Sequence, residues 1–118
     1  MVRYYMLVND PAQALTIAGS ALELAKNNGD NEYFVKINNI LAQYYLDINN
    51  PKKALSLLQE SEQYQPVAMP YLMLKSKTYF QLNQLNKAIE LAHTSKRKAY
   101  DLWSTDDEAF LAKLVSQK

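Results

Sequence analysis

Apolar side chains recur every three or four positions along much of this chain, which is the spacing of one face of an α-helix. Leu55 and Leu58 follow this spacing in one stretch, and Ile89 and Ala92 follow it in another. No β-hairpin signal is found, and the β-branched residues are scattered among Leu, Ala, Lys and Gln, which favour helix. The pattern therefore predicts an all-α fold.

Helix boundaries are marked by capping residues. Asp10 and Asn50 can accept hydrogen bonds from the next turn, and each precedes a proline, Pro11 or Pro51, at the first helical position. Gly29 ends a helix and can adopt the left-handed conformation. The predicted helices are about 2–8, 11–28, 31–48, 51–63, 68–82, 86–102 and 105–117.

Three later helix starts carry other caps. Asp30 or Asn31 can cap the helix that follows Gly29. Asn86 can cap its helix without a proline. Thr105 and Glu108 have capping-box spacing, which predicts the start of the last helix.

Three segments of the chain resemble one another: "YYMLVNDPAQAL" (4–15), "YYLDINNPKKAL" (44–55) and "TYFQLNQLNKAI" (78–89). Their alignment places one tyrosine and one alanine of each segment in shared columns. Ala54 follows Ala14 by 40 positions, and Ala88 follows Ala54 by 34. Internal periods of this length indicate stacked helical repeats.

These columns resemble the tetratricopeptide repeat, a 34-residue pair of helices A and B. The copy at 35–68 matches through Leu41, Ala42, Tyr45, Ala54, Leu58, Ser61 and Pro66. The copy at 69–102 matches through Leu72, Ser76, Tyr79, Ala88, Ala92 and Ser95, and departs at Lys75 and Tyr100. The first copy keeps Tyr5, Ala14, Ala18 and Ala21. The 40-residue spacing is similar to the longer repeats of bacterial signalling and regulatory proteins.

The resemblance implies a single domain, 1–118, built as a right-handed solenoid of about seven antiparallel helices. A partial repeat (1–34) would precede repeats 35–68 and 69–102, and 105–118 would be a capping or partial-repeat helix. Both ends interrupt a repeat, so we expect a fragment of a larger protein, and whether Lys118 is the natural C-terminus stays open. Exposed terminal helices would allow self-association.

The resemblance also implies a partner in the concave surface lined by helix A. By family position, its candidates are Arg3, Met6, Lys36, Asn39, Gln43, Asp47, Met73, Lys77, Phe80 and Gln81. The residues from Lys36 to Asp47 recur at helical spacing on one face. The alternative is a solvated face without a partner, because a fold does not fix a function. The family's clamp for a C-terminal carboxylate is not supported, since Ile40, Pro70 and Leu74 occupy its positions.

Composition narrows the function classes. The net charge is +1, whereas nucleic-acid binders usually carry a strong basic excess. The chain has no cysteine and one histidine, His93, so no metal site or other cofactor is expected. Its two glycines are far apart and form no phosphate-binding loop. No apolar run approaches the roughly 20 residues of a membrane span.

Several single residues have ordinary structural interpretations. Gly19 falls inside a helix, where we expect it to allow close packing. Trp103 is expected to seat the last helix. Ser95 and Lys98 have the S-x-x-K spacing of acyl-enzyme hydrolases, but the companion motifs are absent and Ser95 is already explained as a packing residue.

The leading hypothesis is a non-enzymatic scaffold or sensor domain that binds a protein or peptide within a larger, bacterial regulatory protein. A regulatory domain that binds a small molecule or signal peptide is the alternative. RNA binding through the basic stretch 93–98 is more remote, and an enzyme is the least favoured class. The cytoplasm is the favoured compartment, with the periplasm left open.

Overall fold

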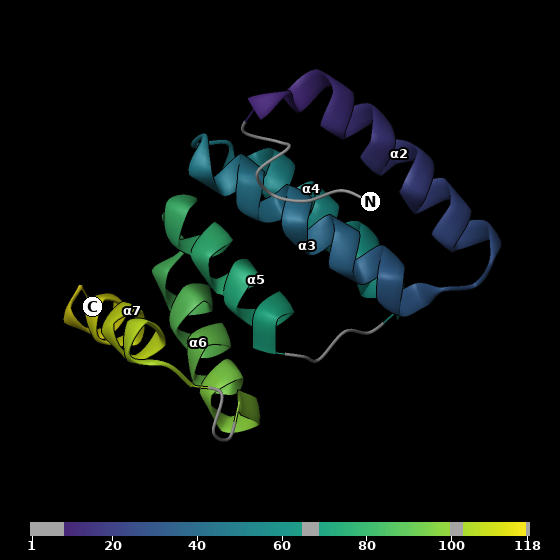
Figure 1. The fold of residues 1–118 in the computed structure, drawn as a ribbon. Coiled ribbons are helices and arrows are strands. Elements are labelled where there is room, and N and C mark those ends of the chain that lie inside the picture. The colour runs from purple at the N-terminus through teal and green to yellow at the C-terminus, as the bar shows by residue number, and fades with distance from the viewer. Residues whose placement is uncertain (1–8, 65–68, 100–102, 118) are drawn as a thin grey trace. The chain divides into compact units, whose positions relative to one another are not determined.

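The computed structural model describes residues 9–64, 69–99 and 103–117, in which helices are joined by short turns and no β-strand occurs. The predicted all-α class is confirmed for these residues. The predicted helix 2–8 lies outside them. The elements are α2 (Pro11–Asn27), α3 (Asn31–Asp47), α4 (Pro51–Ser61), the 3-10 helix η1 (Glu62–Tyr64), α5 (Met69–Gln81), α6 (Leu85–Ala99) and α7 (Thr105–Ser116) (Figure 1).

Apart from the C-terminal end of the helix predicted at 86–102, the bounds of the described helices agree with the predicted ones to within two residues. The stretch predicted as helix 51–63 ends as an α-helix at Ser61 and continues as η1. The helix predicted to start at residue 86 begins at Leu85. Residues 100–102, which the prediction placed in the same helix, lie outside the described residues.

The chain divides into two compact units, Met1–Pro66 and Val67–Lys118. The first contains α2, α3, α4 and η1, and the second contains α5, α6 and α7. The division falls within two residues of the boundary predicted between the repeats 35–68 and 69–102. The single domain inferred from the sequence stays a prediction.

Three helical hairpins share one turn geometry. In each turn the middle residue has a positive φ: 71° at Gly29, 61° at Asn49 and 62° at Asn83. The N–H of the following residue donates to the carbonyl five positions earlier, at 2.8 Å for Asp30, 2.7 Å for Asn50 and 2.9 Å for Gln84. This left-handed closing residue is a common way to end a helix. The expected role of Gly29 is therefore confirmed.

The predicted caps are confirmed at the first three helix starts. The side chains of Asp10, Asp30 and Asn50 accept from the N–H three residues further on, at 3.3, 3.1 and 3.3 Å. Asn86, in contrast, is the second residue of α6 and is not its cap, because the shared turn geometry places Gln84 immediately before the helix.

The capping box of α7 is shifted by one residue from its predicted place. Ser104 is extended (φ −92°, ψ 169°) and accepts from the N–H of Asp107, whose carboxylate accepts from the N–H of Ser104, both at 3.0 Å. Thr105 is already helical, so the box predicted from Thr105 and Glu108 is wrong.

Small residues line the contacts between paired helices. Fully buried small residues recur 34 positions apart at Ala42 and Ser76, Ala54 and Ala88, and Ser61 and Ser95. In the second unit the Ser76 hydroxyl donates to the Ala88 carbonyl at 2.6 Å, which joins α5 directly to α6. A larger side chain at these positions would force the helix backbones apart.

The core of the first unit is shared by α2, α3 and α4. Ala14 and Ala18 pack with Ile37, Leu41 and Leu57. Gly19 takes no part in this contact: a Cβ added there would meet no atom within 4 Å, so the expectation of close packing is wrong.

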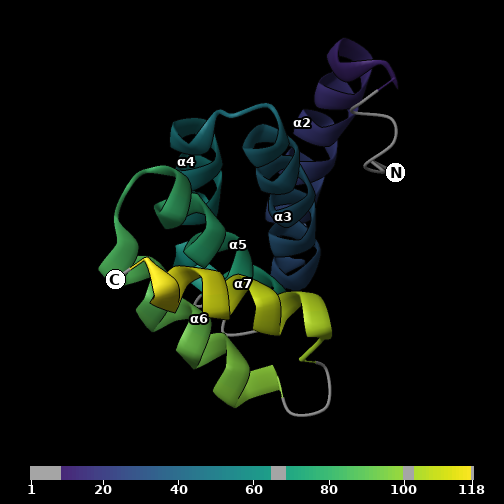
Figure 2. The same ribbon diagram turned by 90° about the vertical axis from the view of Figure 1, so that its left-hand side faces the viewer.

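In the second unit α7 completes the core. The helix lies against α6 (Figure 2). Its Leu111 and Leu114 are buried with Ala88 and Ala92 of α6. Trp103 packs against the same cluster, which confirms that it seats the last helix.

Candidate partner-binding surfaces

The predicted groove residues of α3 lie along one helix and are largely engaged with their own neighbours. The Lys36 ammonium pairs with the Glu32 carboxylate at 3.3 Å, although two thirds of its side chain is exposed. The Gln43 side-chain amide donates to the Asp47 carboxylate at 2.9 Å. Such exposed pairs contribute little to stability and exchange readily with a partner's groups.

Asn39, between these two pairs, differs from them. Its side-chain oxygen is buried and has no hydrogen-bond partner among the described residues, while the residue as a whole is half-buried. A buried polar atom without a partner carries a desolvation penalty. As the structure stands, a ligand cannot reach this buried oxygen, so Asn39 offers a partner only the exposed part of the residue.

Asn38, the residue before it, is a structural contact that the sequence reasoning missed. It is fully buried, and its amide nitrogen donates to the Leu57 carbonyl at 3.1 Å and to the Ser61 hydroxyl at 3.4 Å. These bonds tie α3 to α4. The sequence feature that could have identified this contact is an amide side chain at a core-facing position of a helix, one residue after Ile37.

The predicted groove residues of α5 divide into three environments. Met73 is 4% exposed, so little of its side chain is left for a partner. Gln81 is exposed at the end of the helix. Lys77 and Phe80 are half-buried and contact α7. Arg3 and Met6 lie outside the described residues.

Lys77 and Phe80 belong to what we name the lysine–phenylalanine cluster, with Phe110 and Lys113 of α7. The rings of Phe80 and Phe110 meet edge to face, with centroids 6.0 Å apart and planes at 86°. The Lys77 ammonium lies 5.7 Å from the Phe110 ring centroid, and the Lys113 ammonium lies 5.1 Å from that of Phe80. Phe110 and Lys113 were missed, although their spacing places them on one face of a helix.

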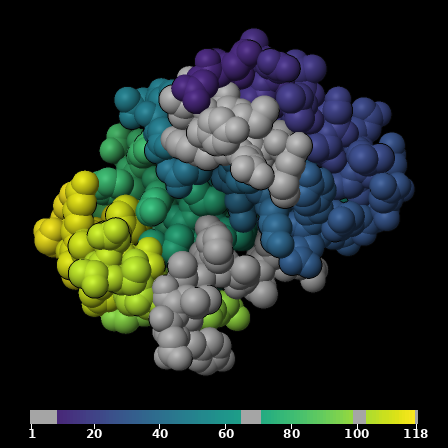
Figure 3. Space-filling model, viewed as in Figure 1, coloured from purple at the N-terminus to yellow at the C-terminus, as the bar shows by residue number. Residues whose placement is uncertain are grey.

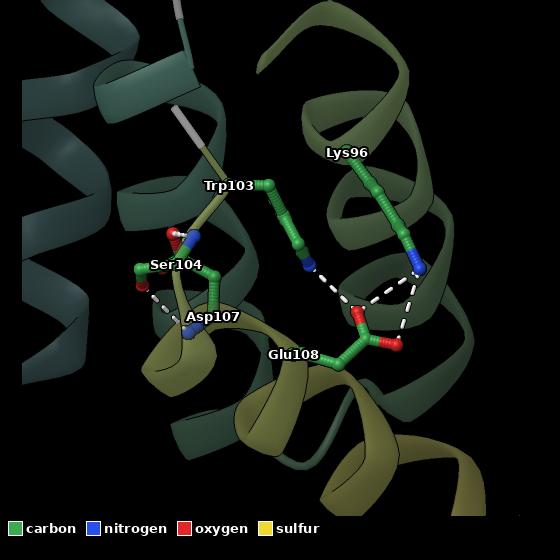
Figure 4. A network of polar contacts seen from close by, with 5 residues as sticks. All are labelled: Lys96, Trp103, Ser104, Asp107 and Glu108. Carbon is green, nitrogen blue, oxygen red and sulfur yellow. Dashed lines mark hydrogen bonds and ion pairs between the residues drawn. The ribbon is translucent and has the colours of Figure 1, made fainter. Parts of the chain in front are cut away.

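A polar network joins the end of α6 to the start of α7 (Figure 4). The Lys96 ammonium contacts both oxygens of the Glu108 carboxylate, at 3.1 and 3.0 Å. The Trp103 indole N–H donates to the same carboxylate at 2.6 Å. The hydrogen bond from Lys96, and after it the one from Trp103, holds the pKa of Glu108 below its ordinary value.

The network also changes the interpretation of the basic stretch 93–98. Lys96 is engaged with Glu108, and the Arg97 guanidinium donates to the Thr94 hydroxyl at 3.1 Å. Ser95 is fully buried, so a substrate cannot reach its hydroxyl as the structure stands, and Lys98 is exposed.

Two kinds of feature are absent from the described residues. None of their helices is long and apolar enough to cross a membrane. Within the same ranges no three His, Asp or Glu side chains gather in a way that could hold a metal ion.

Comparison of the chain with protein-family models, with curated proteins and with solved structures found no match. The functional argument therefore depends on the residues and geometry of this chain.

Proposed function

We propose that this chain is a tetratricopeptide-like interaction module that presents the exposed faces of α3 and α5 to a protein or peptide. The observation that carries the proposal is the correspondence between residues 34 positions apart. The turns at Asn49 and Asn83 have φ values within 1° of each other and equivalent hydrogen bonds, and the small buried residues of the paired helices recur at this spacing. A repeat of this kind supports a right-handed solenoid with helix A lining a concave side.

The surface chemistry supports binding over catalysis. The predicted helix-A positions offer ammonium, amide and aromatic groups: Lys36, Asn39, Gln43, Lys77 and Phe80. Ammonium and amide groups recognise carboxylates and peptide groups, and an aromatic ring offers an apolar contact. We infer a scaffold or sensor role within a larger regulatory protein.

A pull-down with charge-reversed variants tests this function. Lys36→Glu and Lys77→Glu should each reduce capture of a partner, because each places a carboxylate on a proposed contact surface. The matched control is Lys52→Glu in the first turn of α4, where Lys52 is exposed and an acidic residue suits the helix dipole. A partner that is captured equally by all four proteins would remove the helix-A surface from consideration.

Binding of a small molecule is a second candidate, favoured by a surface depression of about 450 Å³ in the first unit. Its lining residues are Leu22, Glu23, Lys26, Phe34, Glu60 and Gln63. Apolar and charged groups meet there, as they do in many ligand sites. A metabolite that raises the melting temperature of the wild type, but not of Lys26→Glu, would support this candidate.

A further inference from the structure

We infer that the lysine–phenylalanine cluster of the second unit is a docking surface for an acidic peptide segment, with apolar side chains between its carboxylates. This inference rests on the proposed function and names the class of partner that α5 and α7 would bind. It extends the predicted helix-A surface to α7, which contributes Phe110 and Lys113.

The cluster fixes two ammonium groups on two different helices. Lys77 of α5 lies over the ring of Phe110 on α7, and Lys113 of α7 lies over the ring of Phe80 on α5. The face of an aromatic ring is negative, so each ring attracts the lysine of the opposite helix. The flexible side chains of Lys77 and Lys113 are thereby held close to the two rings, which lowers the entropy cost of binding a ligand at the cluster.

Neither ammonium is neutralised within the described part of the chain. Lys36 and Lys96 have carboxylate partners at 3.3 and 3.0 Å, whereas no described carboxylate forms an ion pair with Lys77 or Lys113. Asp106, one turn before Phe110, is exposed and is the nearest acidic residue along that side of α7. It pairs with neither lysine, so the local charge favours an acidic ligand.

The rings supply the apolar half of the site. Phe80 and Phe110 are half-buried, which leaves part of each ring open to a ligand, and Lys113 is exposed. Much of α7, coloured yellow, lies at the molecular surface that faces the viewer in Figure 3. A leucine between two glutamates would cover ring surface while the carboxylates meet the ammonium groups, and burial of the ring surface would add to the charge attraction.

Three probe peptides separate charge from apolar contact. Each is acetylated, amidated and labelled with fluorescein, and each alternates leucine with one other residue, which is glutamate, glutamine or lysine. We expect the glutamate peptide to raise the fluorescence anisotropy of a titration with the wild-type chain at concentrations where the other two do not. Added salt should weaken that binding, because part of each ion pair is exposed.

Variants then assign the binding to the cluster. The double variant Lys77→Met and Lys113→Met keeps the aliphatic stems and should weaken binding of the glutamate peptide by about tenfold, the loss expected for two exposed ion pairs. The double variant to arginine keeps the charges and should retain binding. Lys52→Met and Lys53→Met, in α4, remove the same charge elsewhere and should have no effect. Circular dichroism and Trp103 fluorescence show whether each variant is folded.

The outcomes also separate this inference from the proposed function. Equal binding of the glutamate and glutamine peptides would overturn the preference for acid while leaving a peptide-binding surface in place. Unchanged affinity in the methionine double variant would overturn the location. If no probe peptide binds, the acidic docking surface is wrong, and the pull-down with Lys36→Glu and Lys77→Glu decides the proposed function separately.

Discussion

Ser61 and Ser95 occupy equivalent positions 34 residues apart, and replacement by alanine should change stability in opposite directions. Both side chains are fully buried on the second helix of a pair. The Ser61 hydroxyl accepts a hydrogen bond from the Asn38 amide at 3.4 Å. Within the described part of the chain the Ser95 hydroxyl has no hydrogen-bond partner, because the position equivalent to Asn38 is Leu72, which has no donor to offer.

The magnitude follows from that difference. Ser61→Ala removes one hydrogen bond, a loss of about 0.5–1.5 kcal/mol, while the Asn38 amide keeps its bond to Leu57. Ser95→Ala removes a buried hydroxyl that lacks a partner, and relief of its desolvation penalty is worth about 1–3 kcal/mol. The changes in volume and helix propensity are the same at both sites and cancel in the comparison. We therefore expect Ser95→Ala to be more stable than Ser61→Ala by about 1.5–4.5 kcal/mol, the sum of the two effects.

Urea unfolding measures this difference. At an m-value of about 1–3 kcal/mol per molar, a change of about 1 kcal/mol moves the midpoint by roughly 0.3–1 M. Far-UV circular dichroism follows all helices, and Trp103, the only tryptophan, reports on the second unit. If Ser95→Ala lowers the midpoint as much as Ser61→Ala does, the assignment of the unpaired hydroxyl is wrong.

Three further predictions concern single positions. Gly19→Ala should raise the free energy of unfolding by about 0.5–1 kcal/mol, because alanine favours helix and its Cβ meets no neighbour; an unchanged or lower urea midpoint would contradict this. Asn83→Gly should stabilise the second unit and Asn83→Ala should destabilise it by about 1 kcal/mol, since φ is 62° there; equal midpoints for the two variants would refute the turn geometry. The depressed pKa of Glu108 means that its stabilising contribution is present above the unfolded pKa, about 4.3, and is lost as pH falls through the lower folded pKa. Trp103 fluorescence during acid titration should show this loss in the wild type and not in Glu108→Gln, and identical titrations would exclude the network with Lys96 as its source.

Local signals in the sequence predicted most of the helix boundaries correctly. Caps such as Asp10 and Asn50, and the left-handed turn at Gly29, act over three to five residues. The interactions that define them are therefore contained in a short stretch of chain. The two misplaced caps, at Asn86 and Thr105, show the limit of such signals, because neighbouring residues offer similar capping groups and only the backbone conformation selects one.

The candidate site was less accessible to prediction. Lys77 and Phe80 were expected in a groove from their place in the repeat, but Phe110 and Lys113 were not, because nothing in the local pattern states which face of α7 meets α5. The same holds for Glu108, whose partners Lys96 and Trp103 are set by the way α7 returns to α6.

By itself the sequence determined that the chain is helical, where its helices begin and end, and which small residues allow the helices to pair. These properties follow from backbone propensity, capping and side-chain volume, each of which acts locally or repeats with the chain's own period. Only the tertiary structure decided which polar groups meet across helices: Asn38 with Ser61, Lys96 with Glu108, and the two lysines with the two phenylalanines. Such contacts depend on helix rotation and crossing, which many packed side chains set together.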